Sequence, residues 1–236
     1  MSNIRLFFSE NLYLNFSSKL NKSQSHYLIK VMRIKTGENF SLFNSSGEWS
    51  AKITEISKGI AEFNVIEQLR QKDNTKEIWL AFSPIKSNYL NFMIQKATEL
   101  GVTRFIPIIF DRTIVRKINK ERLEKIIIEA TEQSNRIDIP TLEKPQNLKN
   151  FLSNNSKKID LVFTDLNTTN KKLEVSKVAN KPLCAIVGPE GDFSEKEREL
   201  ILNFKSVKSI NINQNILRAE TATISIISII SYILSL

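Results

Sequence analysis

The stretch Leu183–Glu197, LCAIVGPEGDFSEKE, decides the fold class of this 236-residue chain. Its five apolar residues Leu183–Val187 predict a buried strand, and the loop Gly188–Gly191 follows that strand directly. Ser194 then stands three residues before Glu197, which is the capping-box pattern of a helix N-terminus. A continuous apolar strand that leads through a short loop into a capped helix is typical of an α/β fold with a mostly parallel sheet.

The chain around this stretch repeats the alternation of strand and helix. Leu90–Leu100 is apolar at helical spacing, and Gly101 follows as an expected C-terminal helix stop. A second helix is expected around residues 123–130. Further apolar strands are expected at Ile78–Phe82, Val102–Phe110, Ile159–Phe163 and Val207–Ile212. Because parallel sheets bind ligands outside the carboxyl ends of their strands, the loops after these strands are the candidate sites.

The N-terminal part, from Arg5 to Glu67, has short strand-like segments separated by Ser, Asn and Gly turns. Residues 23–32 form one predicted short helix among them. The expected strands are LYLNF, ENFSLF, WSAKITEI and IAEFNVI, at residues 12–16, 38–43, 49–56 and 60–66. Many short strands with one helix predict a small β-barrel, and the densely charged segment 68–77 predicts the linker that follows it.

The charge balance favours a polyanionic partner. The chain carries 34 Lys and Arg residues against 25 Asp and Glu, which gives a formal net charge of +9. Domains this basic commonly bind nucleic acid, since each neutralised phosphate releases condensed counterions. A background composition rich in Lys, Asn and Ile, as AT-biased genomes produce, is the alternative explanation.

The scarcity of Cys and His limits the chemistry. The single Cys184 excludes an intramolecular disulfide, and with the single His26 it argues against a zinc cluster, so we expect no bound metal. His26 lies on the predicted N-terminal helix, as either a structural or a functional side chain. The N-terminal residues are too polar for a signal peptide. The apolar run Ile224–Leu236 has 13 residues interrupted by Ser, short of the roughly 20 that span a membrane. We expect a cytoplasmic protein with no membrane partner.

Three polar loops follow predicted strands. Val187–Phe193 joins a strand to the capped helix, and Thr164–Asn167 follows another strand. The third loop, Ile212–Ala222, places Arg218 and Glu220 two residues apart at a helix start, where an Arg can grip a phosphate and the helix dipole stabilises a carboxylate. Each loop has a structural alternative. Val187–Phe193 could be a plain turn, Thr164–Asn167 a solvated turn, and Ile212–Ala222 a helix cap with an ion pair. Neither G-x-G-x-x-G nor G-x-x-x-x-G-K occurs, which argues against dinucleotide binding and NTP hydrolysis.

Six segments, in order along the chain, form a more specific pattern. They are RLFF (Arg5–Phe8), HYLIKVMRIKTGE (His26–Glu38), QKATELGV (Gln95–Val102), EATEQSNR (Glu129–Arg136), GPEG (Gly188–Gly191) and ILRAETA (Ile216–Ala222). Together they resemble the RsmE family of small-subunit ribosomal RNA uridine N3-methyltransferases, within the SPOUT superfamily. The resemblance spans nearly the whole chain, and its last two segments fall in the polar loops already singled out.

The resemblance implies a fold and an activity. Residues 1–70 would form a PUA-like, RNA-binding β-barrel, and residues 77–236 a SPOUT α/β methyltransferase domain with a deep trefoil knot. The protein would act as a homodimer in the cytoplasm. It would transfer a methyl group from S-adenosylmethionine to N3 of one uridine in the 16S ribosomal RNA of the small subunit.

The resemblance and the chemistry of N3 methylation together suggest site residues. Arg218 and Glu220 would be catalytic, with Glu220 as general base or uracil orienter and Arg218 holding phosphate or the uridine anion. The expected cofactor contacts lie in the three strand-end loops: Thr164, Asp165, Leu166, Val187, Gly188, Pro189, Glu190, Gly191, Ile212, Asn213, Asn215, Ile216 and Leu217. The expected RNA contacts are Arg5, His26, Lys30, Arg33, Arg112 and Arg136.

The chain departs from the family pattern at three places. The family usually has Gly at the position of Asp192, Leu-Gly at Ile212-Asn213, and often Arg at Asn215. Because Asn tolerates the left-handed backbone region, Asn213 is expected to preserve the turn that Gly makes.

Three rival functions differ in class. The first is an RNA-binding or assembly protein without catalysis, which intact GPEG and ILRAETA segments disfavour. The second is a related methyltransferase acting on tRNA or on a ribose 2′-hydroxyl, which the combination of LRAETA with QKATELG disfavours. The third is a small-molecule α/β enzyme, which leaves the charge of +9 without a use.

Overall fold

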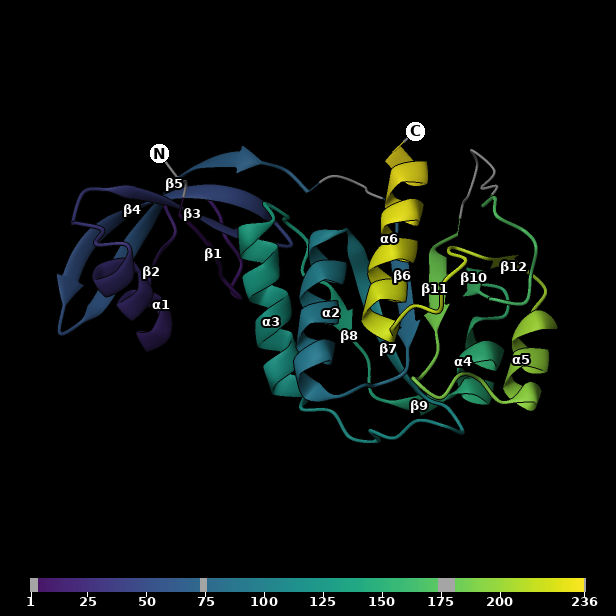
Figure 1. The fold of residues 1–236 in the computed structure, drawn as a ribbon. Coiled ribbons are helices and arrows are strands. Elements are labelled where there is room, and N and C mark those ends of the chain that lie inside the picture. Colours follow the sequence, from purple (N-terminus) through teal and green to yellow (C-terminus); the bar gives the residue numbers. More distant parts are fainter. Residues whose placement is uncertain (1–3, 73–75, 174–180, 236) are drawn as a thin grey trace. The chain divides into compact units, whose positions relative to one another are not determined.

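The computed structural model describes residues 4–72, 76–173 and 181–235. The chain divides into two compact units, drawn in Figure 1. The first comprises Met1–Asn74 together with Thr131–Ile139, and the second comprises Thr75–Ala130 together with Pro140–Leu236.

The first unit is built on a five-stranded sheet in the order β1-β3-β4-β5-β2. The pairing of β1 with β3 is parallel, and the other pairings are antiparallel. Between β4 and β5, Lys58 and Gly59 both have positive φ angles, 50° and 77°, as a two-residue hairpin turn with the twist of its strands requires. The elements are β1 (Arg5–Phe7), β2 (Ser17–Lys19), α1 (Lys22–His26), the π-helical turn η1 (Tyr27–Val31), β3 (Asn39–Asn44), β4 (Gly47–Ser57) and β5 (Ile60–Arg70).

The observed elements differ from the predicted ones in three places. The expected strand at residues 12–16 is instead a turn, in which Asn15 adopts a left-handed φ of 64°. The predicted helix at 23–32 ends in a π-helical turn. Strand β5 continues to Arg70, so the predicted linker begins three residues too early. Among the described strands, no pairing joins the sheet edges β1 and β2.

The core of this sheet is aromatic. The rings of Phe8, Phe16 and Phe40 lie 5.2, 6.2 and 6.0 Å from the ring of Phe63, in edge-on arrangements that favour aromatic pairs. These residues come from separate segments of the chain and pack in one cluster. In a strand, every second side chain points to the same face of the sheet, so Phe40 and Phe63 can both face this cluster.

The segment Thr131–Ile139 belongs to the first unit, although the sequence predicted it within the C-terminal domain. Arg5 explains this: its Nε and Nη2 donate to the two carboxylate oxygens of Glu48 at 3.0 and 3.2 Å. The same guanidinium donates to the main-chain carbonyls of Glu132 and Arg136, at 3.0 and 2.8 Å. Arg5 is 9% exposed and Glu48 is 3% exposed, so this buried charge pair fastens the segment to the sheet.

The second unit is a parallel sheet in the order β12-β10-β11-β6-β7-β8, with β9 also paired to β7. Its strands are β6 (Ile78–Phe82), β7 (Val102–Ile109), β8 (Thr141–Leu142), β9 (Gln146–Asn147), β10 (Asp160–Thr164), β11 (Leu183–Val187) and β12 (Val207–Ile210). Its helices are α2 (Ser87–Glu99), α3 (Lys120–Gln133, whose last residues belong to the first unit), α4 (Leu148–Asn155), α5 (Glu195–Leu202) and α6 (Ala219–Ser235). The predicted long strands and the capped helix are confirmed; α4, β8 and β9 were not predicted.

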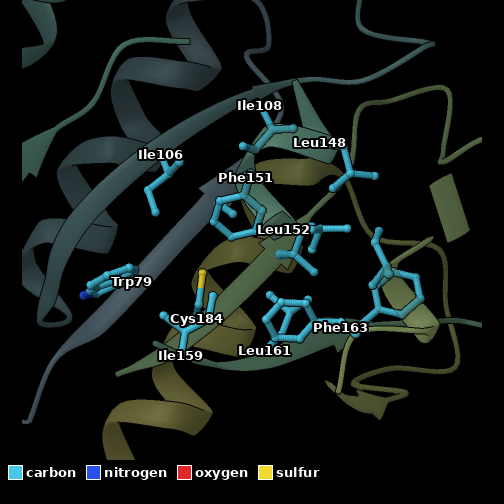
Figure 2. Close-up of a cluster of buried hydrophobic side chains, with 14 of the residues drawn as sticks. Trp79, Ile106, Ile108, Leu148, Phe151, Leu152, Ile159, Leu161, Phe163 and Cys184 are labelled. Atoms are coloured by element: carbon cyan, nitrogen blue, oxygen red, sulfur yellow. The ribbon is translucent and has the colours of Figure 1, made fainter. Parts of the chain in front are cut away.

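The central strands β6 and β11 are buried at every position, as their unbroken apolar sequences predict for a sheet covered on both faces. Helices α2 and α6 lie side by side in Figure 1, and α6 contacts β6 and β11. Figure 2 shows one buried cluster of this unit, which includes Phe151 and Leu152 of α4, Phe163 of β10, Cys184 of β11 and Trp79 of β6. Among the described residues, no helix is long and apolar enough to cross a membrane.

Candidate functional site

A pocket of about 560 Å³ opens where β10, β11 and β12 end. The strands are in register there, since Phe163 pairs with Ile186 and Thr164 pairs with Ile210. The three polar loops predicted as candidate sites therefore meet in one place. The lining residues are Phe163–Asn167, Val187–Phe193, Arg198, Ile212, Asn213, Asn215–Ala219 and Ala222.

The turn after β11 depends on Phe193. A Cβ atom on Gly188 would lie 2.7 Å from the Phe193 ring, closer than real Cβ contacts allow. That ring packs edge-on against Phe110 and Phe163, at 5.1 and 5.2 Å between centroids. Gly188 is thus required by the packing of Phe193, a reason the sequence did not reveal.

The left-handed position in this turn is Asp192, with a φ of 61°. Its Oδ1 accepts the N–H of Phe193 at 2.8 Å, which suits a short polar side chain in that conformation. Glycine adopts the same φ without a Cβ penalty, so the expected exchange of Gly for Asp at position 192 leaves this backbone conformation accessible. Nearby, Arg112 Nη1 donates to the carbonyl of Gly191 at 2.9 Å.

The loop before α6 is shaped by asparagine side chains. Asn211 Oδ1 accepts the N–H of Asn213 at 3.1 Å, and Asn213 Oδ1 accepts the N–H of Asn215 at 2.8 Å. These are successive Asx turns, in which a side chain mimics a backbone turn. Among the described residues Asn213 is not one of the positive-φ positions, so the expectation that it makes a left-handed turn was wrong.

The helix that follows the turn is capped as predicted. Ser194 and Glu197 form a capping box at the start of α5. Both side chains also bind Asp111. Ser194 Oγ donates to Asp111 Oδ2 at 2.6 Å, and the N–H of Asp111 donates to Glu197 Oε1 at 2.8 Å. The cap therefore also holds the end of β7 beside the pocket.

Asp165, an expected cofactor contact, has its carboxylate occupied by the protein. Both Asp165 oxygens accept from Arg198, one at 2.8 Å, and Ser209 Oγ and the N–H of Asn167 also donate to it. Burial raises the pKa of Asp165, but these hydrogen bonds and the charge of Arg198 outweigh burial and hold the pKa below its usual range. Asp165 lines the pocket, and its carboxylate is held by donors of the protein itself.

Two large apolar side chains stand at the exposed rim of the pocket, among polar lining residues. Leu166 is 49% exposed and Ile216 is 86% exposed, although both are large hydrophobic side chains. Both line the pocket. Exposed apolar groups of this kind around a cavity are typical of a surface that a ligand covers.

The predicted catalytic pair is split. Arg218 lines the pocket directly before α6, and Ala219 and Ala222 line it from the first turn of that helix. Glu220 lies in the same turn and is not among the lining residues. Successive helix residues point about 100° apart, which turns Glu220 away from the pocket side of Ala219.

Comparison with known proteins bears on what this pocket is. The family described as "RNA methyltransferase domain" matches residues 72–231, and "RNA methyltransferase PUA domain" matches residues 20–66. The ribosomal RNA small subunit methyltransferase E of Rickettsia conorii is 38% identical over 205 residues, covering 86% of this chain and 84% of that protein. The chain belongs to the ribosomal RNA small subunit methyltransferase E family.

Other relatives of this methyltransferase E family agree. The Aquifex aeolicus protein of that name is 30% identical, covering 96% of this chain and 99% of its own length. The crystal structure of the Neisseria gonorrhoeae methyltransferase E bound to S-adenosyl methionine superposes with a TM-score of 0.88 at 26% identity, covering 98% of each chain.

The RNA contacts expected from the family resemblance fall into two groups. His26, Lys30 and Arg33 are exposed on or just after α1 and η1, and Arg112 is exposed beside the pocket. Arg5 and Arg136 were expected to contact RNA, but neither is an exposed cation. Arg5 is buried with Glu48, and the Arg136 side chain, 12% exposed, donates to Asp138 at 2.6 Å. The N-terminal RLFF segment thus holds the fold of the first unit.

Several residues of this methyltransferase E site were missed by sequence reasoning. Phe193, Arg198, Asn167 and Ala222 line the pocket without having been assigned a role. The helix N-terminus after Ser194 gave a signal for Arg198, since it places that residue on the first turns of a helix beside the pocket.

Proposed function

We propose that this chain is an S-adenosylmethionine-dependent enzyme that methylates N3 of a uridine in 16S ribosomal RNA. The observation that carries the proposal is the pocket at the strand ends, built from the GPEG and ILRAETA loops. Its volume of about 560 Å³ lies in the range of small-molecule sites. Its wall of backbone groups with Leu166 and Ile216 suits a nucleoside cofactor with an apolar face. A relative bound to that cofactor has nearly the same fold.

When bound, S-adenosylmethionine supplies an electrophilic methyl group, which passes to N3 as the sulfur–methyl bond breaks. Uracil N3 carries a weakly acidic proton, so a base must take it before or during attack. Arg218 at the pocket wall stabilises the uridine anion or an adjacent phosphate. Glu220 stays the predicted general base or orienter, although it lies outside the residues that line the pocket in the described chain. If Glu220→Gln keeps wild-type turnover, that assignment is wrong.

The RNA contacts that we propose are His26, Lys30 and Arg33 on the first unit and Arg112 beside the pocket. Their exposed positions and the net charge of +9 support this. N3 lies on the Watson–Crick edge, so the target uridine is unpaired or flipped out of its helix. Since ribosomal RNA is the substrate, we expect the reaction in the cytoplasm.

The finer fold features of the family are part of the proposal. A PUA-like barrel would include the five-stranded sheet, in which the described strands leave the edges β1 and β2 unpaired with each other. A trefoil knot is supported by the path after β12, which returns from the sheet edge to α6 on β6 and β11. A homodimer is supported by α6, where Tyr232 is 67% exposed although Ile226 and Ile230 are buried. Tyr232→Glu should convert the proposed dimer into a monomer, which light scattering would show as half the wild-type mass.

Cofactor binding is the first test. Calorimetric titration with S-adenosylmethionine should show binding by the wild type that Ile216→Glu weakens by about tenfold or more, because a charged carboxylate then replaces the apolar side chain that would cover the nucleoside part of the cofactor. Ile216 is 86% exposed, so this substitution spares the core. Gly188→Val is a poorer choice because it displaces Phe193. A folded wild type that binds no cofactor would favour an RNA-binding protein without catalysis.

The product distinguishes the methyltransferase alternatives. Unmethylated small-subunit RNA is incubated with labelled cofactor and digested to nucleosides. The proposal requires label in 3-methyluridine. Label in a 2′-O-methylnucleoside would instead show methylation of a ribose 2′-hydroxyl and overturn it.

A further inference from the structure

Tyr89 contacts the predicted catalytic arginine from outside the pocket. It lies in the first turn of α2, which runs beside α6 (Figure 1). The guanidinium carbon of Arg218 is 5.8 Å from the centroid of the Tyr89 ring. Tyr89 is 44% exposed and is not among the residues that line the pocket, whereas Arg218 is.

The Tyr89 ring is the side-chain contact of the Arg218 guanidinium among the described residues. In the described part of the chain, no ion pair or side-chain hydrogen bond is formed by the Arg218 guanidinium. An arginine side chain has many rotamers, so an exposed one samples many positions. An aromatic face attracts a guanidinium without using its N–H groups. Those N–H groups stay available for an anionic ligand.

We propose that Tyr89 is a positioning residue for methyl transfer, whose ring holds the Arg218 guanidinium at the pocket wall. The proposal rests on the role proposed above for Arg218. The face of the Tyr89 ring makes this contact, and the Tyr89 hydroxyl takes no part in it. A phenylalanine or tryptophan at this position should therefore still position Arg218, and an alanine should not. The positioning acts on the bound RNA, so binding of the cofactor to the pocket is unaffected.

The test measures methyl transfer to small-subunit RNA at saturating cofactor and RNA. Tyr89→Ala should lower kcat about two- to fivefold, as expected for the loss of an exposed cation–π contact. Tyr89→Phe and Tyr89→Trp should keep wild-type kcat. Calorimetry should give the same cofactor affinity for all three variants, and light scattering should give the same oligomeric state.

Phe92 provides a matched control. It lies one turn further along α2 and is 47% exposed, nearly the same as Tyr89, and in the described chain no cation lies over its ring. Phe92→Ala should therefore keep wild-type kcat. If Phe92→Ala lowers kcat as much as Tyr89→Ala does, the effect belongs to the helix surface and the proposal is wrong.

Arg218→Ala separates failure of this inference from failure of the proposed function. It should lower kcat by about 10²-fold or more, the loss typical of removing one group that stabilises a developing anion. In that background Tyr89→Ala should have no further effect. Full activity of Arg218→Ala would overturn the role of Arg218. A large loss in Arg218→Ala with wild-type activity in Tyr89→Ala, or equal losses in Tyr89→Ala and Tyr89→Phe, would overturn only the positioning role.

Discussion

Asp165 shows at the residue scale how a pocket side chain serves the fold. Its carboxylate accepts from Arg198, Ser209 and the N–H of Asn167. Asp165→Asn should lower the free energy of unfolding by about 2–4 kcal/mol, because Arg198 then loses its buried counter-charge. Urea denaturation at pH 7 measures this. Asp192→Asn, at an exposed carboxylate, should change it by less than about 0.5 kcal/mol, and equal losses in both variants would contradict the assignment.

The same residue makes stability depend on pH. Because the pKa of folded Asp165 is lowered, its stabilisation is complete above the unfolded value of about 3.9 and is lost as the pH falls through the folded value. Between about pH 6 and pH 2, wild-type protein should therefore lose more stability than Asp165→Asn does. If the free energy of unfolding falls equally with pH in the two proteins, Asp165 is not responsible for the loss of stability in acid.

At the scale of elements, the cap of α5 joins a helix to a strand end. Ser194 caps the helix and donates to Asp111 after β7. Ser194→Ala should lower the free energy of unfolding by about 1–2 kcal/mol with an unchanged denaturant m-value, because the cap and the Asp111 contact are both lost. Ser194→Thr keeps the hydroxyl and should recover most of this. A threonine variant as unstable as the alanine variant would rule out the hydroxyl as the cause.

At the scale of the whole molecule, the net charge of +9 should govern RNA affinity. The logarithm of the binding constant should fall linearly with the logarithm of salt concentration. Lys30→Ala and Arg33→Ala should each reduce that slope by about one, since each removes one phosphate contact. Filter binding over a salt series measures the slope. Lys157→Ala, at an exposed lysine after α4, should leave the slope unchanged. If Lys157→Ala reduces the slope as much as Lys30→Ala does, the effect comes from net charge and not from particular phosphate contacts.

Features encoded within a few neighbouring residues were predictable. The strands β6, β10 and β11, the capping box at Ser194 and the left-handed Gly101 after α2 all follow from local patterns. The meeting of three polar loops at one pocket was predictable too, because parallel strands bring their carboxyl ends to one edge.

By itself, then, the sequence determined the α/β class, the strand-end location of the site and the loops that build it. Tertiary structure alone decided which side chains line the pocket and which are paired within the protein. Arg5 is buried by Glu48 and by carbonyls more than 120 positions away, and Asp165 is bound by Arg198, 33 positions away. Charge and size are properties of one residue, but exposure and pairing depend on partners distant in the chain, which only the folded packing brings together.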